Sequence, residues 1–271
     1  MIRKCADSIG VIGNGIVGKA IAFTYENYCD DLFVWDMDPT RNLCNFKDVL
    51  GCQFIFVCVP TPGLSSGNLD TVCVDNVLEK LRKSSSTVII KSTLPVGYTK
   101  AAYKKYKIPN LYHSPEFLDS RTANFDAGHP RFTLVGAVND TQSLNIIDNF
   151  ITTRFPHPMF TYYMLSDESE FVKLMINSFF ATKVAFFNEM RDLSDKLGLN
   201  YNHMSKVMRT DDRVGDEHTR VPGPDGKFGF GGSCLPKDLA AIVALNYSSG
   251  KYPAVAEAAM VRNKLDREKE V

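Results

Sequence analysis

The sequence carries no net charge, because its 31 lysine and arginine residues balance its 31 aspartate and glutamate residues. A chain without a basic excess lacks the electrostatic attraction on which binding to nucleic acid or to an anionic membrane depends. The sequence also lacks an apolar run of membrane length and a basic-then-apolar leader pattern. We therefore expect a soluble, cytoplasmic protein with neither a nucleic-acid nor a membrane partner.

Cysteine and histidine are also sparse. The seven cysteines form no CxxC pair and are odd in number, which argues against a disulfide framework. The five histidines show no metal-ligand spacing, so no metal site is expected. A length of 271 residues suits one large or two ordinary domains.

Short apolar strands alternate with helical patterns in the first part of the chain. Strands are predicted at 8–12, 32–35, 54–59, 87–90, 111–112 and 132–135, and helices at 19–25, 72–81 and 98–106. This alternation is typical of an α/β fold with a doubly wound, Rossmann-type parallel sheet covered on both faces. We assign this domain to residues 1–165.

An all-helical domain is predicted for residues 166–271. Residues 167–197 contain neither proline nor glycine, and their apolar side chains recur every three or four positions, which predicts one long helix. Further helices are predicted at 201–208, 235–245 and from 254 to near the end. The charged residues 262–271 are expected to form a solvated helix end.

A glycine-rich turn follows the first predicted strand. Gly13, Gly15 and Gly18 form a GxGxxG pattern that opens a helix, and Asp36 ends the next strand. This context predicts a dinucleotide site in which the turn approaches the pyrophosphate and Asp36 binds the adenosine ribose. The carboxylate favours NAD over NADP, although Arg41 leaves NADP open. The other expected cofactor contacts of this turn are Asn14, Ile16 and Val17.

Three further segments end predicted strands at the carboxyl edge of the sheet, where ligands of such sheets bind. They are Val59-Pro60-Thr61, Lys91–Pro95 and Ser114–Glu116. Thr93 and Glu116 are candidates for holding water or the nicotinamide end of the cofactor. The alternative is ordinary turn chemistry at strand ends.

The segment Phe228–Asp238 carries a single cysteine out of a glycine-rich turn into the predicted start of a helix. Pro236 suits an early helical position. A helix N-terminus and the nearby Lys237 both favour negative charge on sulfur, so Cys234 is a candidate nucleophile. The alternative is a buried cysteine beside a glycine turn.

Glu170, Lys173 and Asn177 share one face of the long predicted helix. They form either an exposed polar stripe or, because their neighbours are apolar, a group turned into a cleft. In a cleft, the Lys173 ammonium and the Asn177 amide are suited to stabilising an oxyanion.

These motifs together resemble the UDP-glucose/GDP-mannose 6-dehydrogenase family of nucleotide-sugar dehydrogenases. The similar segments run in family order along nearly the whole chain: Gly13–Gly18, Val57–Pro62, Lys91–Gly97, Ser114–Leu118, Glu170–Glu189, Asp212–Gly215 and Phe228–Asp238. The insert 221–227 resembles compact virus- or phage-encoded members.

The resemblance implies an NAD-dependent double oxidation of a sugar C6 alcohol, with UDP-glucose as the expected substrate and UDP-glucuronate as the product. Cys234 would form a thiohemiacetal and then a thioester. Lys173 and Asn177 would stabilise the oxyanions, and Asp238 would assist the hydrolytic water. Thr93 and Glu116 would position water or transfer protons. The remaining implied substrate contacts are Phe117, Leu118, Phe228, Gly229, Gly231 and Gly232, and Arg213 reaching across a homodimer.

The sequence departs from the family in two places. Ser120, preceded by Asp119, stands where the family has a second glutamate. The family also continues into a third, nucleotide-binding domain that is not in this sequence, so we expect weaker substrate binding. Two other functions stay open: a single-step β-hydroxyacid-type dehydrogenase, and a non-catalytic NAD-binding or dimerisation module.

Overall fold

The computed structural model describes residues 7–26, 28–29, 31–139, 144, 147, 150 and 160–269. The chain divides into two compact units. The first comprises Met1–Thr61 and Asp70–Lys173, and the second comprises Pro62–Leu69 and Leu174–Val271. The short segment 62–69 groups with the second unit, which the strand and helix pattern did not indicate.

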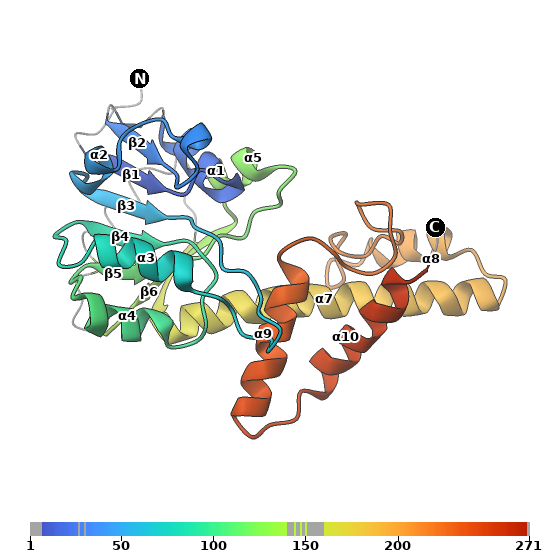
Figure 1. The fold of residues 1–271 in the computed structure, drawn as a ribbon. Coiled ribbons are helices and arrows are strands. Elements are labelled where there is room, and N and C mark those ends of the chain that lie inside the picture. Colours follow the sequence, from blue (N-terminus) through green and yellow to red (C-terminus); the bar gives the residue numbers. More distant parts are fainter. Residues whose placement is uncertain are drawn as a thin grey trace. The chain divides into compact units, whose positions relative to one another are not determined.

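One seven-stranded sheet forms the centre of the first unit, with the strand order β2-β1-β3-β4-β5-β6-β7 (Figure 1). Its strands are β1 Ile9–Ile12, β2 Leu32–Trp35, β3 Phe54–Val57, β4 Thr87–Ile90, β5 Leu111–His113, β6 Phe132–Ala137 and β7 Phe160–Leu165. Strands β1 to β5 are parallel. The chain leaves β1 in one direction to β2 and returns to β3 on the other side, so the β1–β3 boundary is the point where ligands of such sheets bind.

The last two strands differ from the predicted all-parallel sheet. Strand β6 pairs antiparallel with β5 through His113 and Gly136, and β7 then pairs parallel with β6. The predicted doubly wound sheet is confirmed for its first five strands. Strand β7 was not predicted.

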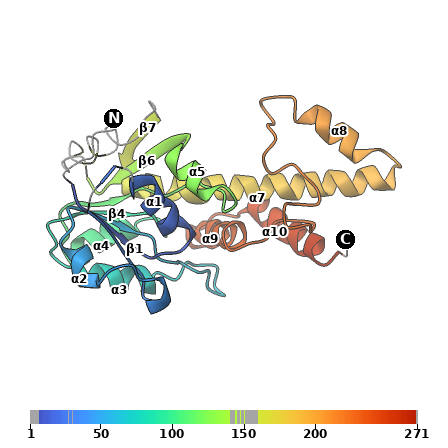
Figure 2. The same cartoon turned by 90° about the horizontal axis from the view of Figure 1, so that it is seen from above.

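Both faces of the sheet are covered by helices. Helices α1 and α5 lie on one face, and α2, α3 and α4 lie on the other (Figure 2). Their bounds are α1 Ile16–Glu26, α2 Phe46–Leu50, α3 Val72–Lys80, α4 Tyr98–Tyr106 and α5 Ala123–Gly128, with a 3-10 turn at Pro39–Arg41.

The strand side chains alternate between two separate cores. In β3, Phe54 and Phe56 pack with Ile21 and Tyr25 of α1. Ile55 and Val57 pack on the opposite face with residues of α3 and α4. Strands β1, β3 and β4 are buried on both faces, so each is an almost continuous apolar run, as buried parallel strands require.

The long predicted helix is confirmed as α7, Ser166–Lys196, and spans 31 residues. Asp167 and Glu168 lie in its first turn, where carboxylates are stabilised by the helix dipole. Gly198 has a φ of 67°, and the Leu199 N–H donates to the Ser194 carbonyl, which ends the helix.

Three shorter helices accompany α7 in the second unit: α8 Tyr201–Met208, α9 Leu235–Ser248 and α10 Ala254–Arg267. Ala181 and Ala185 of α7 pack with Leu239 of α9 and Ala259 of α10 around the buried Phe230. These small residues allow the three helices to approach closely.

The charged end of α10 is not the solvated helix end that the sequence predicted. Asp266 is fully buried and pairs with Arg262 and Lys269, and both cations also pair with Asp192 of α7. A charge run near the end of a sequence resembles a solvated tail, and only the packing of α10 on α7 reveals its partners.

Candidate functional site

The glycine turn after β1 has the shape that a pyrophosphate site requires. A Cβ on Gly18 would lie 1.7 Å from the Gly13 carbonyl oxygen, and one on Gly13 would lie 2.6 Å from the Cys58 carbonyl oxygen. The turn therefore packs directly on the start of α1 and on the end of β3. A Cβ on Gly15 would meet no protein atom within 4 Å, which leaves that side of the turn open to a ligand.

Asp36 is fixed beside this turn. Its carboxylate accepts the Asn14 N–H at 2.6 Å and the Asp38 N–H at 2.9 Å. The Asn14 amide donates to the Arg41 carbonyl at 2.7 Å. The Arg41 guanidinium pairs with Asp38 at 3.3 Å. Arg41, the residue that kept NADP as an alternative cofactor, therefore already has an acidic partner.

The ends of β3, β4 and β5 are joined by side chain–main chain hydrogen bonds. The Thr61 hydroxyl donates to the Thr93 carbonyl at 2.8 Å, and the Ser92 hydroxyl donates to the Val59 carbonyl at 2.6 Å. These bonds bring the predicted Val59–Thr61 and Thr93 segments to one edge of the sheet. Pro60 is exposed there.

A buried histidine continues this chain of hydrogen bonds. His113 has one ring nitrogen 3.3 Å from the Ser92 carbonyl oxygen and the other 2.9 Å from the Ser169 hydroxyl of α7. Complete burial lowers the pKa of His113 to about 3, so the ring is neutral at physiological pH. Burial also lowers the pKa of the nearby Lys91 to about 8.

Lys173 and Glu116 lie together in the first unit. The Lys173 ammonium donates to the Glu116 carbonyl at 2.6 Å and lies 4.0 Å from its carboxylate. The same ammonium lies 4.9 Å from the centre of the Phe117 ring. The Glu116 carboxylate accepts the Leu118 N–H at 2.7 Å. Lys173 is only 5% exposed, which excludes the exposed polar stripe.

Glu170 caps helix α4 from within α7. Its carboxylate accepts the Gly97 N–H at 2.6 Å, the Thr99 N–H at 2.7 Å and the Thr99 hydroxyl at 2.6 Å. Burial raises the pKa of Glu170 to about 7, although these three hydrogen bonds oppose the rise. Glu170 therefore anchors the first turns of α7, one turn before Lys173, to the edge of the sheet.

Cys234 is the N-cap residue of α9 and is exposed, which excludes the buried-cysteine alternative. Pro236 lies in the first turn of α9, as predicted. The Lys237 ammonium differs from the expectation, because it donates to the Asp238 carboxylate at 2.5 Å. Lys237 therefore pairs with a carboxylate instead of the Cys234 sulfur.

Asp238 links α9 to α7. It is fully buried, and it accepts the Asn177 amide at 2.5 Å in addition to Lys237. The Asp238 N–H donates to the Cys234 carbonyl at 3.0 Å in the first turn of α9. A buried carboxylate is tolerated only when its oxygens are satisfied, so this pair fixes the orientation of the Asn177 amide against the first turn of α9.

The remaining predicted residues differ in their surroundings. The Arg213 side chain is 90% exposed and pairs with Asp211 at 2.6 Å. Asp119, next to Ser120, pairs with Arg121 at 2.6 Å. Phe228 packs beside Phe187 and Val221. Ile16 is exposed at the start of α1, and Val17 follows it, half-buried.

Sequence reasoning missed several polar residues that shape the site. Asn188 is buried and accepts the Gly229 N–H at 2.9 Å, and Asn263 accepts the Phe230 N–H at 2.6 Å. The signal was available for Asn188, because it continues the helical spacing of the buried Ala181 and Ala185. A polar residue at a core position of a helix needs a partner.

Comparisons with known proteins identify the family. Residues 43–152 match the NAD binding domain of the UDP-glucose/GDP-mannose dehydrogenase family, and residues 167–265 match its central domain. The UDP-glucose 6-dehydrogenase of Campylobacter jejuni is 32% identical over 241 residues. The chain therefore belongs to the UDP-glucose/GDP-mannose dehydrogenase family, whose members are NAD-dependent nucleotide-sugar dehydrogenases.

Solved structures with the same fold support the architecture. A UDP-glucose dehydrogenase from Pyrobaculum islandicum superposes with a TM-score of 0.81 at 22% identity, covering 97% of this chain and 69% of that one. A UDP-D-ManNAc dehydrogenase from Pyrococcus horikoshii gives 0.79 at 21% identity, covering 95% and 68%. The match to the Campylobacter jejuni relative covers 87% of this chain, which spans 60% of that relative.

The cofactor is NAD, and the residues present fit it. The open side of Gly15 and the fixed carboxylate of Asp36 lie together at the switch point of the sheet. No group of three potential metal ligands occurs in the described ranges. None of the helices in those ranges is both long and apolar enough to cross a bilayer.

Replacing Gly15 and Gly18 by alanine separates cofactor binding from folding. We expect Gly15→Ala to unfold at the wild-type urea midpoint but to bind NAD at least about tenfold more weakly, because the methyl group enters only the ligand's space. Gly18→Ala should destabilise the protein, because its methyl group meets the Gly13 carbonyl oxygen. Titration calorimetry with NAD and urea unfolding measure both. An unchanged NAD affinity in Gly15→Ala would show that NAD does not bind at this turn.

Glu170 should make stability depend on pH. Because its pKa is raised from 4.5 to about 7, the folded protein holds this proton more tightly than the unfolded chain does. The contribution of Glu170 to stability therefore decreases as pH rises from about 4.5 to about 7. Glu170→Gln should be less stable than wild type at pH 5, and the difference should narrow by more than about 1 kcal/mol by pH 7.5.

Urea unfolding of wild type and Glu170→Gln at both pH values tests this expectation. His113 titrates in both proteins, so the difference between them isolates Glu170. A difference that is the same at pH 5 and pH 7.5 would contradict the raised pKa.

Proposed function

We propose that the chain oxidises the C6 alcohol of a nucleotide sugar to the carboxylate in two steps, with UDP-glucose as substrate and UDP-glucuronate as product. The observation that carries the proposal is Cys234, an exposed thiol at the N-cap of α9. One turn further, the buried Asp238 holds Asn177. The name of the Campylobacter jejuni relative supports UDP-glucose as the substrate. A protein of the same fold is named for UDP-D-ManNAc, so a panel of nucleotide sugars should be tested.

NAD, held by Asp36 and the Gly13–Gly18 turn, would supply the hydride acceptor. Because each NAD accepts one hydride, a second NAD would replace the NADH before the second oxidation. In the first oxidation the alcohol loses a hydride and a proton and becomes an aldehyde. Lys173 and Asn177 are suited to stabilising negative charge on this oxygen, because each is a buried donor with a fixed partner. Glu116 and Thr93 are assigned to proton transfer and to positioning water.

The Cys234 sulfur then bonds to the aldehyde carbon, and the carbonyl oxygen takes up a proton. Loss of a second hydride and of that proton leaves a thioester. Water attacks the thioester carbon, the carbon–sulfur bond breaks, and the thiol is restored. A thiol is needed because a thiohemiacetal still carries a transferable hydride, and a thioester hydrolyses more readily than an oxygen ester.

Asp238 has a defined part in this proposal. Its carboxylate is shared between Asn177 and Lys237, so it orients the amide against the turn that follows Cys234. We assign to it assistance to the hydrolytic water. The Gly229, Gly231 and Gly232 main chain and Phe228 are proposed to contact the sugar, together with Leu118 and Phe117.

Replacing Cys234 by serine tests the thiol chemistry. We expect Cys234→Ser to form no thioester and no uronate, because an oxygen nucleophile is weaker and its ester is harder to hydrolyse. Wild type should release two NADH per sugar, measured by absorbance at a limiting sugar concentration. Mass spectrometry should find a thioester on Cys234.

One NADH per sugar in wild type would favour a single-step β-hydroxyacid-type reaction instead. NAD binding with no turnover on any nucleotide sugar would favour the non-catalytic module. Cys73→Ser is the control, because it makes the same change at a half-buried cysteine of α3 that has no part in the proposed chemistry.

We also propose a homodimer formed through α7. Exposed apolar side chains follow one face of this helix at intervals of four and seven residues: Met175, Phe179, Phe186 and Leu193. Such a stripe is typical of a helix that packs against another copy. The exposed Arg213 is free to extend from its pair with Asp211 towards a neighbouring subunit, which is the role assigned to it.

Charge on this stripe should separate the subunits. Phe186→Glu combined with Leu193→Glu should halve the mass measured by light scattering, because two carboxylates cannot be desolvated in an apolar interface. Phe125→Glu places the same charge at an exposed phenylalanine of α5 and should leave the mass unchanged. A wild-type protein that is already monomeric would contradict the dimer.

A further inference from the structure

The loop that precedes Cys234 is held by side chains from two helices. Asn188 of α7 accepts the Gly229 N–H at 2.9 Å. Asn263 of α10 accepts the Phe230 N–H at 2.6 Å, and the Arg267 guanidinium donates to the Phe230 carbonyl at 3.0 Å. Two consecutive residues of the loop are therefore fixed through their main chain, and Phe230 is fixed at both its N–H and its carbonyl.

The contact between the loop and α10 is close. Gly229 has a φ of 70°, and a Cβ there would lie 2.5 Å from the Asn263 side-chain oxygen. A Cβ on Gly231 would lie 2.0 Å from the Arg267 guanidinium. By contrast, no atom lies within 4 Å of the corresponding position on Gly232. Asn188, Asn263 and Arg267 therefore form a clamp on the first part of the loop. This clamp leaves Gly232 open.

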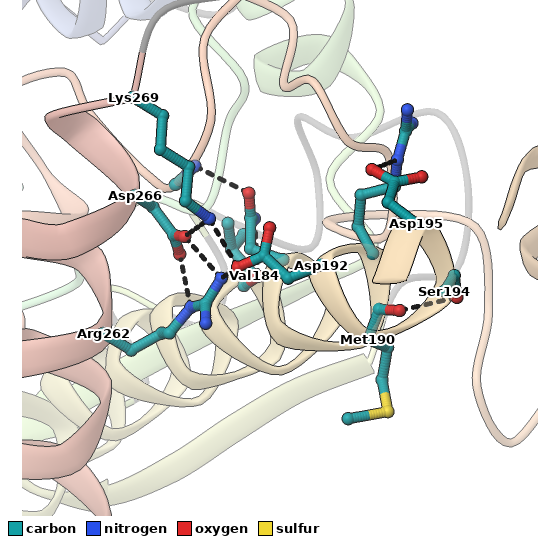
Figure 3. Close-up of polar contacts among 11 residues, drawn as sticks. Val184, Met190, Asp192, Ser194, Asp195, Arg262, Asp266 and Lys269 are labelled. Carbon is teal, nitrogen blue, oxygen red and sulfur yellow. Dashed lines mark hydrogen bonds and ion pairs between the residues drawn. The ribbon is translucent and has the colours of Figure 1, made fainter. Parts of the chain in front are cut away.

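Helix α10 is itself fixed to α7 on either side of Asn263. Arg262 and Lys269 both pair with Asp192 of α7, and both also pair with Asp266 (Figure 3). The pKa of Asp192 lies below its ordinary value, because the bonds from Lys269 and Arg262 outweigh the effect of burial. These pairs set the position from which Asn263 reaches the loop.

The insert 221–227 contributes to the same arrangement. Its Asp225 pairs with the Arg267 guanidinium at 2.8 Å, and the Gly223 N–H donates to the Lys227 carbonyl at 2.8 Å to close the insert on itself. Arg267 therefore bridges the insert and the Phe230 carbonyl.

We propose that Asn188 and Asn263 are positioning residues that set the approach of the Cys234 thiol. Helix α9 begins at Leu235, so only residues 231–234 separate its first turn from the clamped Phe230. With one end held by the clamp and the other by the helix, this short segment has little freedom. Its catalytic importance rests on the proposed function, whereas the clamp itself does not.

Removing one acceptor should loosen the thiol. We expect Asn263→Ala to be alkylated at Cys234 by iodoacetamide at least about threefold faster than wild type, because a mobile loop exposes the sulfur more often. Its kcat should fall about tenfold or more, with the KM for NAD within about twofold of wild type. Asn263→Asp keeps the acceptor oxygen, so its alkylation rate and its kcat should both stay close to those of wild type.

Asn246→Ala is the matched control, because the amide of Asn246 bonds to the Ile242 carbonyl within its own helix, α9. Asn188→Ala should resemble Asn263→Ala, and the double variant should show less than the product of the two effects, since both residues hold one loop. Mass spectrometry of the Cys234 peptide follows the alkylation.

A wild-type alkylation rate in folded Asn263→Ala and Asn188→Ala would overturn the proposal. Hydrogen exchange on the wild-type protein tests it without any variant: the Gly229 and Phe230 amides should exchange at least about tenfold more slowly than the Gly232 amide, and equal rates would overturn it. If wild type turns over no nucleotide sugar, the proposed function fails, while alkylation and exchange still decide whether the clamp exists.

Discussion

A fully buried carboxylate, that of Asp238, is the constraint on which the arrangement around Cys234 depends. Burying a charge is costly unless its oxygens are satisfied, and here the Asn177 amide and the Lys237 ammonium satisfy them. Asn177 belongs to α7 and Asp238 to the first turn of α9. The pair therefore joins the helix that carries the proposed oxyanion donors to the helix that begins beside the thiol.

A second buried carboxylate performs the same task at the start of α7. Glu170 accepts three hydrogen bonds from the beginning of α4 and so fixes the turn before Lys173. The sequence placed Glu170, Lys173 and Asn177 on one helix face, but their partners differ. Glu170 binds a helix end, Lys173 a carbonyl and Asn177 a carboxylate, so one polar face contains an anchor and two candidate catalytic donors.

The elements of the fold could largely be predicted from the sequence, because periodicity and glycine turns are local. The β1 strand, the Gly13–Gly18 turn and α7 lie where their patterns predicted. The reversal of β6 could not be predicted, since strand direction depends on pairing with β5. The site was predictable only in its residue types. That Asn177 pairs with Asp238, and that Asn263 reaches the loop from α10, depends on contacts between residues far apart in the sequence.

The segment 62–69 interrupts the first unit and belongs to the second. A Cβ on Gly67 of this segment would lie 3.0 Å from the Ala240 carbonyl oxygen of α9, so the segment lies tightly on that helix. The polypeptide consequently crosses between the units three times, at residues 61–62, 69–70 and 173–174. During synthesis, residues 62–69 are made long before α9, so they can pack in their final position only after α9 has been made. The two units are therefore not independent modules. If the sheet unit were fused to a different helical domain, segment 62–69 would lose the surface of α9 on which it packs.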